Sequence, residues 1–130
     1  MTKASAIHQF WNSFGINAYE ENVVYDVDED GKEISPKSPY ITYQLVTDSF
    51  GNEVQMTASI WYRSGSWTAI NLKADEVSEY IGYGGVMIPF DNGSIWLKRG
   101  TPFAQNMGDD NDSLIKRKYL NLSAEFFSAN

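Results

Sequence analysis

The chain has 130 residues, with 17 acidic side chains against 10 basic ones and a formal net charge of −7 at pH 7. A surface that grips phosphates needs clustered Lys and Arg, so this balance disfavours nucleic-acid binding as the main activity. The absence of cysteine excludes disulfides, thiolate catalysis and thiolate metal sites, and the length predicts one domain over residues 1–130.

The first predicted element is an amphipathic helix over residues 4–14. Its apolar residues recur at the spacing of one helical face and are Ile7, Phe10, Trp11 and Phe14. Gly15 is a natural stop for this helix. The N-terminal residues lack the apolar core of a signal peptide, and no apolar run in the chain approaches a membrane span. His8 is expected to be an ordinary surface or capping residue.

An acidic segment follows a predicted short strand at residues 23–25. Residues 26–31 read Asp-Val-Asp-Glu-Asp-Gly, which matches the opening of a calcium loop. The twelfth position, which supplies a bidentate glutamate in such loops, is Lys37. We therefore expect Asp26–Asp30 to belong to a solvated turn, with a metal site as the alternative.

The centre of the chain predicts a β-hairpin over residues 40–63. Large apolar and polar residues alternate along both halves, which is typical of strands with two unequal faces. The break between the halves contains Gly51-Asn52, where a positive φ costs little. We expect this hairpin to be the most stable part of the protein, with Ile60 in the core.

The C-terminal half predicts four further segments. A helix runs from Trp67 to Ile81, capped by the Ser66 hydroxyl. A second hairpin covers residues 86–98, with Asn-Gly as its turn signal. Residues 100–113 are predicted to form a mobile loop or a long excursion from the sheet, because they are polar and acidic. A closing strand covers residues 114–127.

This order of elements predicts an α+β fold. We expect a mixed or antiparallel sheet of about five to six strands, with two helices on one face. The hairpins 40–63 and 86–98 would supply most of the sheet.

The sequence contains no recognisable catalytic constellation. It has one histidine, no cysteine and no G-x-S-x-G motif. The carboxylate groups at Asp26/Asp28 and at Asp109/Asp110/Asp112 lie in turn-like segments rich in Gly and Asn, where solvated loops explain them better than acid–base catalysis. We therefore predict a protein that is not an enzyme, with no catalytic, cofactor or metal site.

Large apolar residues are predicted on both faces of the sheet. Alternation places Trp61 and Tyr62 on opposite faces, and it does the same for Ile95 and Trp96. The helices can cover only one face, and a monomer rarely exposes an extended apolar patch. We predict Trp61 and Trp96 as subunit or partner contacts; the alternative is that they are single exposed tryptophans.

The order of several short motifs resembles a known family. These motifs are Ser-Pro-Tyr-Ile-Thr-Tyr (38–43), Ile-Trp-Tyr (60–62), Lys-Ala-Asp-Glu-Val (73–77), Gly84-Gly85, the Asn-Gly hairpin, Pro-Phe-Ala-Gln (102–105) and Asp112. Together they are similar to tail-terminator or tail-completion proteins, which join heads to tails in long-tailed phages of Gram-positive bacteria. The resemblance covers nearly the whole chain.

That resemblance implies a structural role at the head–tail junction of the virion. Such a protein, made in the host cytoplasm, would close into a ring, expected to be a hexamer. One side would end the tail tube and the other would meet the head connector or stopper protein. DNA would pass through the lumen without specific binding, and Asp109, Asp110 and Asp112 would face the lumen or rim. No membrane would be involved.

A second hypothesis is a small acidic binding protein of the immunity or inhibitor type. Its acidic segments 26–33 and 109–112 would dock a basic partner protein. A ring, or an oligomer that depends on concentration, favours the first hypothesis, whereas a strict monomer favours the second.

Overall fold

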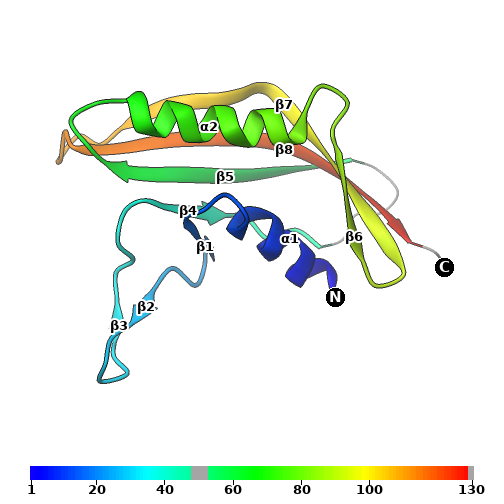
Figure 1. The fold of residues 1–130 in the computed structure, drawn as a ribbon, viewed down its shortest axis with the longest axis horizontal. Helices are drawn as coiled ribbons and strands as arrows, with labels where there is room; N and C mark the ends of the chain where they lie inside the picture. Colours follow the sequence, from blue (N-terminus) through cyan, green and yellow to red (C-terminus); the bar gives the residue numbers. More distant parts are fainter. Residues whose placement is uncertain (48–52, 129–130) are drawn as a thin grey trace.

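The computed structural model describes residues 1–47 and 53–128 (Figure 1). Its elements in chain order are α1 (Lys3–Asn12), β1 (Asn17–Glu20), β2 (Asp26–Val27), β3 (Glu33–Ile34), β4 (Tyr40–Tyr43), β5 (Val54–Arg63), α2 (Thr68–Ile81), β6 (Val86–Phe90), β7 (Gly93–Gly108) and β8 (Ile115–Ser128). No helix in the described ranges is both long and apolar enough to cross a membrane.

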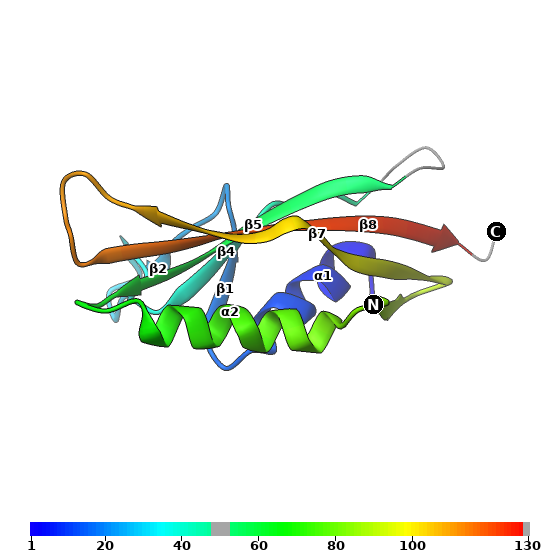
Figure 2. The same cartoon turned by 90° about the horizontal axis from the view of Figure 1, so that it is seen from above.

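Six of these strands form one curled sheet in the order β1-β4-β5-β8-β7-β6. The β1–β4 pair is parallel and the other neighbours are antiparallel, so the sheet is mixed. Both helices lie on the same side of this sheet (Figure 2). The predicted α+β fold, with its mixed sheet and two helices, is therefore confirmed.

The core lies between the helices and one face of the sheet. The buried helical residues recur at the predicted spacing and are Ala6, Ile7, Phe10 and Trp11 on α1, and Ile70, Ala74, Val77 and Ile81 on α2. Below them the central strands β5 and β8 bury Met56, Ala58, Ile60, Leu120, Leu122 and Ala124. The opposite sheet face, here called the helix-free face, carries the alternate residues of the same strands.

Both predicted hairpins are present. β4 and β5 pair with Ile41 opposite Ile60, while the predicted Gly51-Asn52 turn lies outside the described residues. β6 and β7 are joined by a tight turn in which Asn92 has a φ of 65°. A Cβ on Gly93 would lie 2.1 Å from the Phe127 carbonyl oxygen, so this strand start requires glycine.

The prediction of a loop over residues 100–113 was wrong for most of its length. β7 continues to Gly108 and stays paired with β8, apart from a shift in register between Arg99 and Ala104. Between these two pairs β7 advances five residues while β8 advances two, so β7 accommodates three extra residues there. The polar composition of this part of β7 suggested a loop, although the residues pair with β8, the next strand along the chain. Only residues 109–114 turn between the two strands.

The strand predicted at residues 23–25 was also wrong. The sheet is instead entered by β1, which pairs with β4. Residues 23–25 lead into the small β2–β3 hairpin, which pairs Val27 with Glu33. This hairpin, residues 26–34, projects away from the body of the protein and is called the arm below (Figure 1).

Candidate functional site

The helix-free face carries a continuous row of large side chains across four strands. The row, here called the aromatic ladder, consists of Tyr19 on β1, Tyr40 on β4, Trp61 on β5, and Arg117 and Tyr119 on β8. Each of these side chains is half-buried. The ladder exists because the sheet register places Tyr40 opposite Trp61, and Trp61 opposite Arg117.

The rings of the ladder are in direct contact. Tyr19 meets Tyr40 edge to face with ring centres 6.0 Å apart. Tyr40 stacks on Trp61 with centres 6.1 Å apart and an angle of 16° between the planes. The Arg117 guanidinium then lies 5.0 Å from the centre of the Trp61 ring and 5.3 Å from that of Tyr119. These distances are those of favourable aromatic and cation–π contacts.

Hydrogen bonds from neighbouring strands hold the ladder in place. Trp61 Nε1 donates to Thr42 Oγ1 at 2.9 Å. Arg117 Nε donates to Ser59 Oγ, also at 2.9 Å. The Trp61 indole N–H and the Arg117 Nε–H are therefore bonded within the chain, which restrains both side chains before any partner binds. A surface ordered in advance loses less entropy on binding.

Two tyrosines of the ladder, Tyr19 and Tyr40, have pKa values above the usual range. Burial raises the pKa of Tyr40. Burial also raises the pKa of Tyr19, as does the hydrogen bond from its hydroxyl to Asp26 Oδ1 at 2.7 Å. This bond ties the base of the arm to the ladder. Aromatic rings with a guanidinium match the composition of protein interfaces, so the face is suited to docking another protein surface.

The acidic turn at residues 109–114 lies at the same end of the sheet as Trp61. Asp109 Oδ1 accepts hydrogen bonds from the backbone N–H groups of Asn111 and Asp112. Asp112 forms an ion pair with Arg63, two residues beyond Trp61 on β5. Arg63 and the Leu114 N–H hold the pKa of the Asp112 carboxyl below its usual range. Asp110 is exposed.

Trp96 lies on the helix-free face too, but at the opposite end of the sheet from Trp61. Trp61 pairs with Arg117, and Trp96 pairs with Glu125, further along β8. Arg117 and Glu125 are eight residues apart on β8. At about 3.3 Å per residue, the two tryptophans therefore lie about 26 Å apart along the strand direction. The Trp96 indole donates to the Gly84 carbonyl oxygen at 2.9 Å and is covered by the Lys98 ammonium. The two predicted tryptophans therefore do not form one patch.

The acidic segment Asp26–Asp30 has the contacts of a turn. Asp28 Oδ1 accepts from the backbone N–H groups of Asp30 and Lys32, each at 2.9 Å. Gly31, with a φ of 79°, completes the reversal. Within the described part of the chain, no group of three or more His, Cys, Asp or Glu side chains is placed to hold a metal ion.

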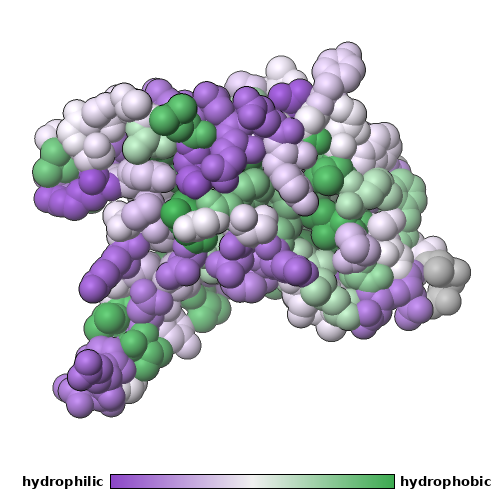
Figure 3. Space-filling view, in the orientation of Figure 1, coloured by the Kyte–Doolittle hydropathy of each residue, from purple (hydrophilic) through white to green (hydrophobic). Residues whose placement is uncertain are grey.

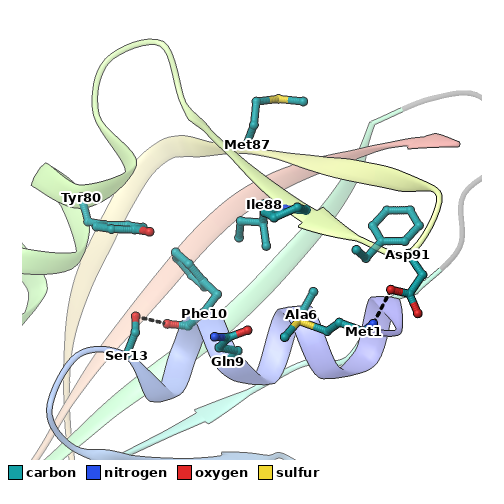
Figure 4. A pocket seen from close by; sticks show the side chains of 11 residues that line it. Met1, Ala6, Gln9, Phe10, Ser13, Tyr80, Met87, Ile88 and Asp91 are labelled. Atoms are coloured by element: carbon teal, nitrogen blue, oxygen red, sulfur yellow. Dashed lines mark hydrogen bonds and ion pairs between the residues drawn. The ribbon is translucent and has the colours of Figure 1, made fainter. Parts of the chain in front are cut away.

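A concave site lies on the helix side, between α1 and β6 (Figure 4). This cleft has a volume of about 440 Å³, and its walls include Phe10, Ile88 and the half-exposed Tyr80. The Asp91 carboxylate at its rim pairs with the N-terminal ammonium of Met1. The cleft thus combines apolar side chains with the Met1–Asp91 ion pair at its rim.

Sequence reasoning identified Trp61 but missed its neighbours in the ladder. Alternation does place Tyr40 and Trp61 on the non-core side of their strands, and it also separates Arg117 and Tyr119 from the buried leucines of β8. What alternation cannot supply is the register between β5 and β8, which lie far apart along the chain. That register alone brings Arg117 onto Trp61.

Comparisons with models of known protein families, with curated proteins and with solved structures found no match for this chain.

Proposed function

We propose that this protein is a structural, non-enzymatic component of a phage head–tail junction. In this role it assembles into a ring, expected to be a hexamer. The ring ends the tail tube and joins it to the head connector or stopper protein. The resemblance of the sequence motifs to tail-terminator proteins is the starting point of this proposal.

The aromatic ladder is the observation that carries the proposal. It is a row of three tyrosines, a tryptophan and an arginine in mutual contact, on a sheet face that neither helix covers. Residues of these types dominate the binding energy of protein interfaces. A ring protein needs such a surface for its neighbour or its tube, and it needs no reacting groups.

The charge distribution supports the same role. The acidic turn with Asp109, Asp110 and Asp112 stands at the ladder end of the sheet, and the whole chain carries a net charge of −7. A lumen lined by carboxylates lets DNA pass without adhering to the wall, because phosphates are repelled. The proposed ring therefore has these turns at its lumen or rim.

Replacing Trp61 by Ala tests this proposal. The variant should remain folded, because Trp61 lies outside the core, but it should fail to assemble or to cap tubes. Phages that carry it should accumulate heads and tails that do not join, or tails of irregular length, when viewed by electron microscopy. Leu72→Ala is the matched control, since Leu72 is 64% exposed on α2, away from the sheet face.

Two results would count against the proposal. Joined virions with tails of normal length in the Trp61→Ala phage would mean that the ladder is not part of the assembly surface. An enzymatic activity of the purified protein, abolished by a single carboxylate substitution, would contradict the structural role. A protein that stays monomeric even with tail tubes would favour the alternative of a small acidic inhibitor, for which the projecting acidic arm is suited.

A further inference from the structure

The arm exposes apolar side chains that the rest of the chain does not cover. Val27 is 58% exposed and Ile34 is 39% exposed. Figure 3 shows hydrophobic atoms on the arm between strongly polar ones. An isolated two-stranded hairpin is only marginally stable in water. A projecting hairpin with apolar side chains on its surface is therefore suited to docking on another surface.

The arm is also strongly acidic. Its nine residues contain five carboxylates and one lysine. A surface that receives the arm must offer apolar contact together with positive charge, because burying carboxylates without a partner costs free energy.

A groove beside the α2–β6 connection offers both features. This groove, here called the Tyr83 groove, has a volume of about 400 Å³. It is lined by Tyr83, Arg99 and residues 100–103. Tyr83 is fully exposed on the short connection between α2 and β6. The Arg99 guanidinium donates to the neutral Ser78 hydroxyl at 2.9 Å, and it brings a positive charge to the lining of the groove.

The arm and the Tyr83 groove lie at opposite sides of the protein. The arm follows β1, one edge of the sheet, whereas Tyr83 precedes β6, the other edge. Figure 1 shows the arm at the lower left and the α2–β6 connection at the upper right. One chain therefore cannot fill its own groove. A contact between two different surfaces of identical copies repeats head to tail, and it closes into a ring when the rotation permits.

We infer that the arm of one copy docks in the Tyr83 groove of the next copy. Val27 and Ile34 contact the apolar side chains of the groove, and arm carboxylates approach Arg99. This inference rests on the proposed ring and names one of its subunit contacts.

Paired cysteines test this contact directly, because the natural chain has none. Lys32 on the arm and Thr101 in the groove are both exposed, and neither supplies the apolar or charged contacts. The Lys32→Cys/Thr101→Cys protein, treated with a short bismaleimide, should give a series of covalent multimers. The largest should contain as many copies as the ring. The matched control is Lys32→Cys/Leu72→Cys, which carries its second cysteine on an exposed part of α2 and should stay largely uncrosslinked.

The outcomes separate this inference from the proposed function. If the uncrosslinked protein forms rings that cap tubes but the Lys32/Thr101 pair gives no more multimer than the control, the arm docks elsewhere and the inference is wrong. If the pair crosslinks efficiently but the assembly does not act on tail tubes, the contact stands and the proposed function fails. A monomer with no crosslinking at any concentration, with or without tubes, overturns the inference.

A charge exchange provides a second, independent test. Arg99→Glu places a carboxylate against the acidic arm and should weaken self-association by about tenfold or more, since like charges at an interface cost several kcal/mol. Adding Glu29→Arg on the arm should restore much of the lost association. Thermal unfolding of each variant establishes that it is folded. An Arg99→Glu protein that associates as well as the natural one would rule out this groove as the acceptor.

Discussion

Trp61 lies at the centre of the ladder, with Tyr40 stacked on one side and Arg117 on the other. Its indole N–H is bonded to Thr42, so the side chain is fixed by its own sheet. Among the described residues, no buried side-chain nitrogen or oxygen lacks a hydrogen-bond partner. The contacts of Trp61 with Tyr40, Arg117 and Thr42 restrain it without a ligand, and a side chain restrained in advance loses less entropy on docking.

Asp112 links this face to the acidic turn, and its ion pair predicts a dependence of stability on pH. The pKa of Asp112 is lowered by the hydrogen bond from Arg63 and by the Leu114 N–H. A carboxylate with a lowered folded-state pKa stabilises the fold above its unfolded pKa of about 4, and this stabilisation is lost as the pH falls through the folded-state value.

Asp112→Asn should therefore lower the melting temperature at neutral pH but make little difference in acid. The measurement is thermal unfolding of both proteins, followed by circular dichroism, from about pH 6 down to about pH 2. The gap between the two melting temperatures should shrink over the acid part of this range. A gap that is constant, or that widens in acid, would mean that the Arg63–Asp112 pair does not stabilise the fold.

The elements that could be predicted from the sequence are those whose signals lie within a short stretch of the chain. The helices α1 and α2 and the two hairpins follow from spacing and turn residues within short windows, and each was predicted. β7 beyond Arg99 and the short β1 could not be recognised in this way. Each exists because another strand offers an edge to pair with: β4 for β1, and the following strand β8 for β7. A short or polar segment shows no sign of that partner in its own sequence.

The same limit applies to the candidate site. Trp61 was identified from the alternation of β5, whereas Arg117 required the β5–β8 register. The arm was recognised only as an acidic turn, because its projection from the body depends on how residues 17–43 pair. Sequence therefore located the tryptophan of the helix-free face but not the ladder around it.

The stability of the β5 element can be measured through Ile60. This side chain is 0% exposed and lies beneath the helices. Ile60→Ala should lower the free energy of unfolding by roughly 2–5 kcal/mol, the range for emptying a buried aliphatic site. Urea unfolding of the variant gives this number. Thr57→Ala, on the helix-free face of the same strand, is the control, and it should cost less than Ile60→Ala. If Ile60→Ala lowers the free energy of unfolding by less than about 1 kcal/mol, the core face and the helix-free face of β5 have been assigned the wrong way round.

At the scale of the whole molecule, the helices divide the protein into two unlike sides. One side holds the core and the cleft of Figure 4, and the other presents the aromatic ladder and Trp96. The arm and the Tyr83 groove then mark two opposite edges of the sheet. A subunit with unlike edges and one exposed aromatic face is suited to head-to-tail closure, with the face left for a further partner.

The ring proposal is tested most directly by electron microscopy of tail tubes assembled with and without the purified protein. With the protein, each finished tube should carry a six-fold ring at one end and stop growing there, so the tube lengths become uniform. Bare tube ends that continue to elongate in the presence of excess protein would contradict the proposed function.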